Sequence, residues 1–408
     1  MVSAKHNGVM VPVPLGQVGE FRAGFGFPVA LQGRREGRYP FAKVGDISKV
    51  ARAGGREIAD AEHYVNDEDL PLLKAKPLPA HSIVFAKIGE AISQNFRALT
   101  TREMLIDNNT MGFVADRSRL DIRYALHFFL RLDLYRHTDA TTVPAIRKST
   151  LESIPIPLPF PDDPKRSLAE QKRIAATLDK ADAIRRRRQE AARLADQLIP
   201  SLFFESYSRY FAPRPVGKLV SLEDGCEQIT DGVHITPTYV EQGVAFLRIT
   251  DIKNGTVDWS TVKRIPRAEY AEITRKSRPR KGDILYSKNG TIGIPIEITW
   301  DEEFAHFVSL ARISPKLDVF DPTFLCTFLG TDLALRQATR HSKTLTVTNL
   351  HLVEIRQILA PCPPLDEQRR FVQRARRLQE LCRSERHALA DAEDLFNSLV
   401  QRAFRGEL

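Results

Sequence analysis

An internal repeat constrains what this chain can fold into more than any other feature of its sequence. Residues 168–203 align without a gap with residues 365–400, so that Gln171 faces Gln368. Similarity at a fixed period of about 200 residues indicates two copies of one structural unit. The chain is therefore expected to fold as two equivalent halves.

The segments that precede these two stretches match as well. Residues 39–47 resemble residues 244–252, and residues 83–92 resemble residues 284–293. Residues 14–16 are aligned with residues 215–217, and Gly24 with Gly225. The order along the chain is thus a module, a long segment, a second module and a second long segment.

Each module is predicted to mix strands with helices. Short β-branched or aromatic runs at residues 83–85, 112–114, 284–286 and 308–313 lie between Gly, Asp and Pro, which is typical of strands. A helix is expected to follow in each module, over residues 123–135 and 323–337. The proline-rich segments 154–164 and 360–364 cannot continue a helix and are expected to be extended.

The two long segments are predicted to be helices that pack on each other. Their apolar residues recur at spacings of three and four, which places them on one face, and some 38 residues would span roughly 57 Å. If the helices are antiparallel, their midpoints meet, and Arg188 would pair with Glu385; the alternative is that both are solvated without contact. The expected seam between the helices consists of Ile174, Leu178, Leu198, Leu202, Phe371, Leu378, Leu395 and Leu399, with Arg188 and Glu385.

The predicted fold is α+β, with two tandem α/β modules separated by two long helices that pair as an antiparallel coiled coil. The modules are placed at residues 1–167 and 211–364, and the helices at residues 168–210 and 365–408. The whole forms a pseudo-two-fold repeat.

Composition narrows the class of partner. The chain of 408 residues carries a formal net charge of +9, which favours a polyanionic partner, and nucleic acid before membrane. Four cysteines without a C-x-x-C pair argue against a disulfide framework or a structural zinc site. With so few cysteines, a reducing cytoplasm is the expected location. No signal peptide and no apolar run long enough for a membrane span is visible.

Motifs for chemistry are scarce. The sequence lacks a P-loop, a G-x-G-x-x-G fingerprint, a G-x-S-x-G or H-E-x-x-H motif and the signature of amino-methyltransferases. The best enzymatic candidate is a metal-dependent nuclease fragment with Asp283, Lys288 and Glu297. The acidic-x-Lys triplet of such nucleases is missing, so a structural turn at Asp283 is the favoured interpretation.

Basic and polar residues beside expected loops remain as candidates for binding DNA, because Lys and Arg suit phosphates or guanine edges and Asn suits adenine edges. Lys87 and Lys288 each precede a tight turn at matching places. The run Arg185–Arg188 points all round a helix and is interpreted as a solvated face with one or two phosphate contacts. The candidates are Lys43, Lys87, Arg97, Arg102, Arg147 and Lys148 in the first module, and Arg248, Lys253, Lys288, Asn289, Lys343, Thr344, Thr346 and Asn349 in the second.

The helix entries carry a family resemblance. Residues 156–159 with 168–171, and residues 363–368, combine prolines with Leu-x-Glu-Gln, and residues 230–237 read Thr-Asp-Gly-Val-His-Ile-Thr-Pro. Together they resemble the specificity subunits of type I restriction–modification systems over essentially the whole chain. The likeness adds Thr230, Asp231 and His234 to the candidates. The first module departs from it, because it lacks the Asp-Gly-x-His segment and carries Gly26-Phe-Pro-Val-Ala there.

The resemblance implies a non-catalytic, DNA-binding subunit. Each module would be a target-recognition domain that reads half of a bipartite, asymmetric double-stranded DNA site, and the helices would set the gap. Two modification subunits would dock on the helices and bring S-adenosylmethionine, and restriction subunits would bring ATP- and Mg-dependent translocation. No cofactor or metal is expected in this chain. The alternatives are the same role in a methyltransferase–nuclease fusion system, a free-standing nuclease or methyltransferase, and a protein scaffold that ignores DNA.

Overall fold

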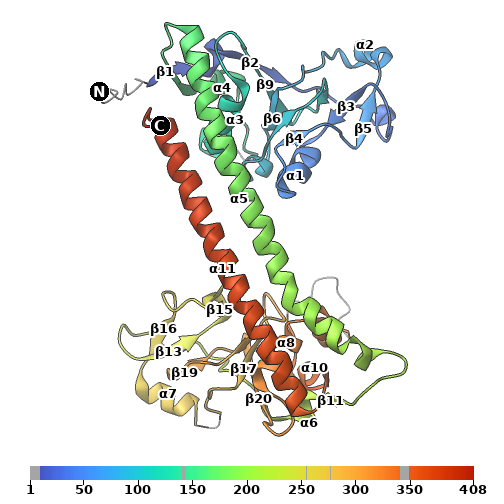
Figure 1. The fold of residues 1–408 in the computed structure, drawn as a ribbon, viewed down its shortest axis with the longest axis vertical. Helices are drawn as coiled ribbons and strands as arrows, with labels where there is room; N and C mark the ends of the chain where they lie inside the picture. Colours follow the sequence, from blue (N-terminus) through green and yellow to red (C-terminus); the bar gives the residue numbers. More distant parts are fainter. Residues whose placement is uncertain (1–9, 140–142, 254, 276, 341–348) are drawn as a thin grey trace. The chain divides into compact units, whose positions relative to one another are not determined.

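The computed structural model describes residues 10–139, 143–253, 255–275, 277–340 and 349–408. The chain forms two compact units (Figure 1). Unit 1 comprises Met1–Gln189 with Ala388–Leu408, and unit 2 comprises Glu190–His387. Each unit therefore holds one module together with a part of both long helices, and the units divide within these helices rather than at their ends.

Unit 1 is built on two small sheets and a two-stranded ribbon. Its strands are β1 (Met10–Pro14), β2 (Gly19–Ala23), β3 (Tyr39–Ala42), β4 (Glu57–Ile58), β5 (His63–Val65), β6 (Ile83–Ala86), β7 (Arg97–Thr100), β8 (Leu105–Ile106), β9 (Thr110–Ala115) and β10 (Pro155–Pro159). The sheets have the orders β2-β9-β6-β7-β4 and β5-β3-β8, and β1 pairs with β10. The short helices are α1 (Val44–Arg52), α2 (Leu70–Leu73), α3 (Ile122–Arg131) and α4 (Lys148–Ser153).

Unit 2 repeats this plan with some changes. Its strands are β11 (Leu219–Ser221), β12 (Cys226–Asp231), β13 (Val244–Leu247), β14 (Ile252–Lys253), β15 (Thr256–Val257), β16 (Lys263–Ile265), β17 (Ile284–Ser287), β18 (Pro295–Glu297), β19 (Phe304–His306), β20 (Leu310–Pro315) and β21 (Leu359–Pro361). They form the sheets β12-β20-β17-β18 and β16-β13-β19 and the ribbons β14-β15 and β11-β21. The short helices are α6 (Leu222–Gly225), α7 (Arg267–Ile273), α8 (Pro322–Leu329), α9 (Asp332–Ala338) and α10 (Leu352–Arg356).

The strand registers confirm the repeat. In both three-stranded sheets the central strand, β3 or β13, is antiparallel to one neighbour and parallel to the other. In both larger sheets β6 or β17 lies antiparallel to β9 or β20, with Ile83 opposite Phe113 and Ile284 opposite Ile313. The proline-rich segments contain extended strands as predicted, because β10 and β21 pair with β1 and β11 in two-stranded ribbons.

Two of the predicted alignments were wrong. The amides of Leu15 and Leu222 each donate to the carbonyl before a ribbon strand, so Leu15 corresponds to Leu222 rather than Val216. Gly24 corresponds to Gly232, because a Cβ on Gly24 would lie 2.4 Å from the carbonyl oxygen of Ile106, and a Cβ on Gly232 would lie 2.2 Å from that of His306, the equivalent residue. The connections before these glycines differ in length, which a gapless comparison of sequences misses.

The long helices are α5 (Pro164–Tyr207) and α11 (Leu365–Ala403). In unit 1 the beginning of α5 and the end of α11 share a core, with Ile174 and Leu178 beside Val400. In unit 2 the end of α5 packs with the beginning of α11, where the rings of Phe203 and Phe371 lie 5.4 Å apart. This pairing of opposite ends confirms the antiparallel arrangement.

The apolar seam differs from its prediction at two positions. Leu198 and Leu395 are 38% and 54% exposed, whereas the other predicted apolar seam residues are buried or pack against a core. The stripe is also shared with the modules, because the same clusters contain residues of α3 and α8. Arg188 and Glu385 belong to different units, so their pairing stays a prediction.

Candidate nucleic-acid interface

Two cations of the first module directly follow strands and interact electrostatically with the same carboxylate, that of Asp107. Lys43 directly follows β3 and Lys87 directly follows β6, and both are half-buried. The Nζ of Lys43 donates to Gln32 at 3.0 Å and lies 5.3 Å from the centroid of the Phe27 ring. Burial lowers the pKa of Lys87, against the opposing charge of Asp107. Burial also raises the pKa of Asp107, with Lys43 among the groups that oppose the shift.

The position of Lys43 recurs in the second module as Arg248. In both modules the cation caps a helical turn, and its backbone amide donates at 2.8 Å to a carboxylate, Asp46 or Asp251. The Arg248 guanidinium also grips Asp251, at 3.0 and 2.6 Å, and lies 6.0 Å from the centroid of the Tyr239 ring. The repeat therefore places a cation beside an aromatic ring in each module.

Arg97 has a structural role that its sequence did not indicate. Its side chain is 2% exposed and donates to the carbonyls of Phe96 and Leu132 and, at 2.5 Å, to the side chain of Asn95. Burial lowers the pKa of Arg97 to about 9, opposed by Asp133. This guanidinium holds loops of unit 1 together and does not present a surface, which corrects its place among the DNA-binding candidates.

The remaining candidates of the first module are exposed. Arg102 donates to the carbonyl of Arg38 at 2.6 Å, Arg147 pairs with Asp139 at 2.9 Å, and Lys148 lies 3.6 Å from Glu152. Exposed pairs of this kind contribute little to stability, so these cations can exchange their partners for phosphates.

The second module buries its lysine. Lys288 is 6% exposed, and its Nζ lies 3.0 Å from Oδ1 of Asp231. The exposed ring of His234 lies 3.9 Å from the other oxygen of Asp231. Thr230, the neighbour of Asp231, shares a 2.8 Å hydrogen bond with Ser277. The strand registers place Ala23 of the first module where Asp231 stands in the second, so Lys87 has no counterpart of this ion pair.

The other candidates of the second module are only partly described. Asn289 and the exposed Asn349 form an isolated antiparallel bridge. Lys253 lies in β14, opposite Thr256. Lys343, Thr344 and Thr346 lie outside the described residues.

The geometry does not support the nuclease alternative. Asp283 is buried and receives hydrogen bonds from Arg312 at 2.7 Å and Ser314 at 2.5 Å, while Lys288 is paired elsewhere. Burial raises the pKa of Glu297. Within the described residues, no group of three or more His, Cys, Asp or Glu side chains is placed to hold a metal. Asp283 thus belongs to a structural ion pair, in agreement with the favoured interpretation of the sequence.

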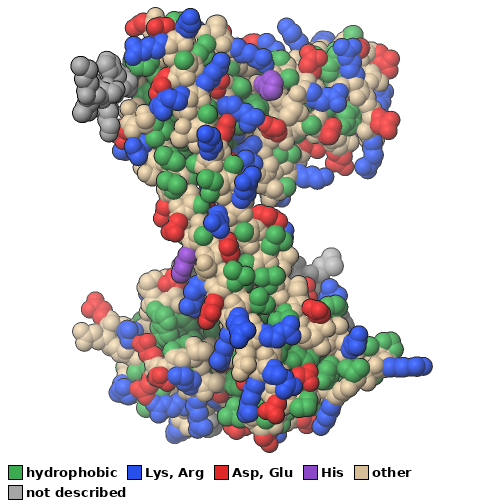
Figure 2. Space-filling view, in the orientation of Figure 1, with side chains coloured by type: hydrophobic (Ala, Val, Ile, Leu, Met, Phe, Trp, Pro, Cys, Tyr) green, Lys and Arg blue, Asp and Glu red, His purple; other side chains and the backbone are tan. Residues whose placement is uncertain are grey.

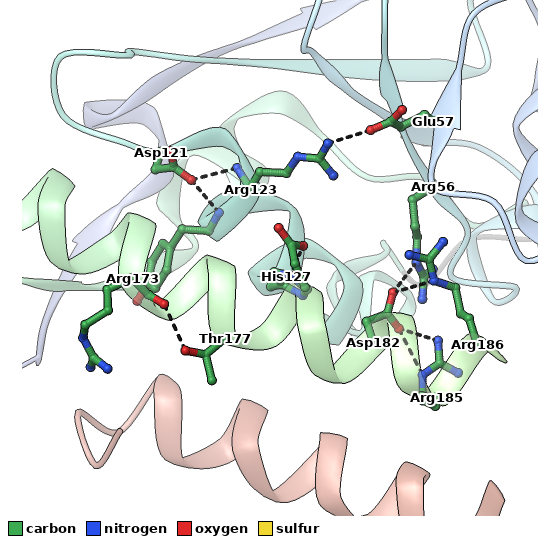
Figure 3. A network of polar contacts seen from close by, with 12 residues as sticks. Arg56, Glu57, Asp121, Arg123, His127, Arg173, Thr177, Asp182, Arg185 and Arg186 are labelled. Atoms are coloured by element: carbon green, nitrogen blue, oxygen red, sulfur yellow. Dashed lines mark hydrogen bonds and ion pairs between the residues drawn. The ribbon is translucent and has the colours of Figure 1, made fainter. Parts of the chain in front are cut away.

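The sequence analysis did not predict the role of two polar features. Gln171 and Gln368 are both fully buried and tie the long helices to their modules. Their recurrence in the repeat indicated that they matter, but it did not indicate what they contact. Arg56 meets Asp182 of α5 near the arginine run, and nothing in the sequence links positions so far apart (Figure 3).

The surface charge is distributed. Figure 2 shows Lys and Arg side chains over both units on one face of the molecule, interspersed with Asp and Glu. Within the described part of the chain, none of the helices is both long and apolar enough to cross a bilayer.

Comparison with known proteins gives a consistent result. Residues 8–193 match the family model described as the type I restriction modification DNA specificity domain. The chain is 26% identical over 302 residues to the type I restriction enzyme EcoBI specificity subunit of Escherichia coli, which covers 67% of this chain and 62% of that relative. It is 23% identical over 399 residues to the MjaVIII specificity subunit of Methanocaldococcus jannaschii, covering 91% of this chain and 87% of the relative.

Two solved structures share the fold. The S subunit of the type I restriction–modification system of M. genitalium superposes with a TM-score of 0.55 at 13% identity, covering 98% of both chains. A chain from a study of the assembly and conformational transition of the type I system gives a TM-score of 0.53 at 18% identity, again with 98% of both chains covered. At these identities the likeness shows the fold alone.

Proposed function

Because the chain belongs to the family of type I restriction–modification specificity subunits, we propose that it selects the DNA sequence on which such an enzyme acts. Each module, with the bounds expected from the sequence, reads one half of a bipartite, asymmetric site in double-stranded DNA. The long helices set the gap between the halves and carry the partner subunits.

The observation that carries this proposal is the recurrence of cations in two modules of one topology. Lys43 and Arg248 occupy the same turn, each beside an aromatic ring. Lys87 and Lys288 follow the same strand, but Asp231 neutralises Lys288, so that lysine does not enter the argument. Two copies of a binding module in one chain suit a site with two half-sites. The modules differ in the residues around these cations, as in the change of Ala23 to Asp231, and this favours two different half-sequences.

The helices have the length that a spacer requires. Half-sites on one face of B-DNA lie about 34–36 Å apart for one helical turn. At about 1.5 Å per residue, the 44 residues of α5 span about 66 Å. The spacing of the half-sites is therefore proposed to follow from the length of α5 and α11.

Exposed apolar side chains on the helices support docking of two modification subunits. In unit 1, Ile184 of α5 and Leu395 of α11 are 52% and 54% exposed; in unit 2, Leu381 and Leu198 occupy the repeat-equivalent positions and are 48% and 38% exposed. Each unit thus presents an exposed apolar side chain at the same two repeat-equivalent positions. Two equal surfaces suit two copies of one partner.

The proposal assigns the chemistry to partners. S-adenosylmethionine would be bound by the modification subunits, and ATP and Mg²⁺ by restriction subunits where these are present. This chain supplies recognition and assembly, in the cytoplasm where the host DNA lies.

The test is to map methylated adenines in a host genome that carries this chain with its modification subunit, against a genome with the modification subunit alone. A gapped two-part motif found only with this chain supports the proposal and identifies both half-sites. A complex that is verified as assembled and active, yet adds no motif, contradicts it.

A further inference from the structure

Three guanidinium groups of unit 1 converge on one buried carboxylate (Figure 3). Arg185 and Arg186 lie on the same helix as Asp182. The Nε and Nη2 atoms of Arg185 donate to Oδ1 of Asp182 at 3.0 and 2.6 Å, and the Nε of Arg186 lies 3.1 Å from Oδ2. Arg56, which precedes β4 in the module, lies 3.7 Å from the same Oδ2. The cluster therefore joins α5 to the module through one negative charge shared by three positive ones.

The carboxylate and two of the three guanidinium groups are largely shielded from water. The Asp182 side chain is 5% exposed, and those of Arg185 and Arg56 are 17% and 25% exposed, whereas that of Arg186 is 39% exposed. Burial works to raise the pKa of Asp182, but the bond from Arg185 and the three arginine charges outweigh it and lower the pKa. Burial lowers the pKa of Arg56, and the charges of Arg185 and Arg186 add to that effect while Asp182 opposes it. Neighbouring Asp179 is engaged by His127 at 2.8 Å.

A cavity of about 470 Å³ adjoins this cluster. Arg56 and Arg185 form part of its wall, and α3 and α11 add further cationic and amide side chains. The Nε of Arg56 is buried and, among the described residues, has no hydrogen-bond partner, since Asp182 is beyond hydrogen-bonding distance. The polar lining consists of Arg56, Asn95, His127, Arg131, Arg185 and Asn397, with Glu393 as an opposing charge.

This chemistry matches a phosphate group. Guanidinium forks bind phosphate oxygens through paired charge-assisted hydrogen bonds, and amides add neutral donors. A second anion would balance the charge that Asp182 leaves uncompensated, in a place where water screens it poorly.

We propose that the cavity between α3, α5 and the end of α11 binds a phosphate group. The phosphate comes either from the backbone of bound DNA or from a free phosphate compound. The first source rests on the proposed function, and the second does not.

Unit 2 lacks this arrangement and provides the control. The repeat places Gln379, Cys382 and Arg383 where unit 1 has Asp182, Arg185 and Arg186. Arg383 is exposed on α11 at the position that corresponds to Arg186 of α5. The substitution Arg383→Gln therefore removes one arginine from the equivalent place in unit 2 and leaves the cavity unchanged.

Inorganic phosphate is titrated into the full-length chain by calorimetry, with chloride adjusted to keep ionic strength constant. We expect saturable binding at one site per chain, weakened about tenfold or more by Arg56→Gln and by Arg185→Gln and unchanged by Arg383→Gln. Absence of saturable binding to the folded wild-type chain, or equal weakening by Arg383→Gln, overturns the proposal.

Thermal unfolding at matched ionic strength separates misfolding from loss of the site. Phosphate is expected to raise the unfolding temperature of the wild type and of Arg383→Gln, but not that of a folded Arg56→Gln chain. A folded Arg56→Gln chain that gains the same stability from phosphate overturns the proposal.

A DNA experiment distinguishes the two sources. If the phosphate belongs to DNA, Arg56→Gln makes the negative slope of log affinity against log salt less steep, by about 0.9 for one lost phosphate contact. If the source is a free compound, the slope is unchanged while phosphate binding is lost. In both cases the methylated motif stays the same, so failure of the proposed function is recognised separately.

Discussion

The side-chain oxygen of Gln171 accepts a hydrogen bond from the backbone amide of Asp121 at 2.8 Å. Asp121 is the N-cap of α3, and the amide of Gln171 also donates to the carbonyl of Arg119 at 3.0 Å. Gln368 makes the same contact with Asp321, the N-cap of α8, at 2.9 Å. One glutamine thus fastens each long helix to the first turn of a module helix.

Replacing Gln171 with Ala is expected to lower the free energy of unfolding of unit 1 by about 1 to 3 kcal/mol, because it leaves the partly buried Asp121 amide without its acceptor. Hydrogen exchange of peptides over residues 119–125 measures the loss. Gln368→Ala is the matched control and is expected to affect residues 319–325 instead. Equal exchange in Gln171→Ala and the wild type would show that the contact does not stabilise the module.

The two repeated lysines are expected to respond differently to removal of their charge. Lys288→Met leaves Asp231 without the partner of a largely buried ion pair and is expected to destabilise unit 2 by about 2 to 4 kcal/mol. Lys87→Met removes an ammonium whose charged form burial already disfavours, so the fold is expected to persist while reading of the first half-site weakens.

The measurements are urea unfolding and the methylated motif for both variants. A destabilised Lys87→Met, or a stable Lys288→Met that changes the second half-site, would reverse these assignments of Lys87 and Lys288.

The stability of unit 2 is expected to depend on pH through His306. Burial, with the charge of Arg312, lowers the pKa of His306 to about 3 from an ordinary 6.5. Below pH 6.5 the unfolded chain therefore binds a proton that the folded chain does not, and stability falls as the pH falls towards 3. The loss is at most about 1.4 kcal/mol per pH unit.

The variant His306→Ile tests this, since Ile106 occupies the equivalent place in the first module. Urea midpoints at neutral pH and near pH 5 are expected to differ less for the variant than for the wild type. Parallel pH dependence in the two proteins would assign the effect to other groups.

Charge placed on the exposed helix positions is expected to impair assembly. Leu395→Asp in unit 1 or Leu381→Asp in unit 2 leaves folding intact, because both side chains are about half exposed, but weakens binding of the modification subunit. The mass of the complex by light scattering then falls from two bound partners towards one. Val353→Asp, at an equally exposed position on α10, is the control, and loss of partners in that variant as well would refute a specific surface.

The sequence allowed most of the architecture to be predicted, because repetition and periodicity are properties of the chain itself. The strands at residues 83–86 and 284–287 and the antiparallel pairing of α5 with α11 were found as expected. The helix predicted at residues 323–337 is divided at Gly330 into α8 and α9. The apolar residues keep their helical spacing across this break, so the sequence pattern did not reveal it.

Individual roles were harder to predict because they depend on what lies opposite a side chain. Lys87 and Lys288 occupy equivalent places in the sequence, yet Lys288 pairs with the carboxylate of Asp231, whereas the first module has Ala23 at the position of Asp231. Arg97 looked like a surface cation until its burial against Leu132 was visible. Leu198 and Leu395 fit the apolar spacing but lie on the outer side of their helices.

The sequence by itself determined the duplicated plan and the long helices, since these follow from repetition and local periodicity. The tertiary structure decided which cations are neutralised, which are exposed and which converge, as Arg56 does on Asp182. Burial and ion pairing arise between residues far apart in the chain, and their strength depends on distances that only the folded molecule defines.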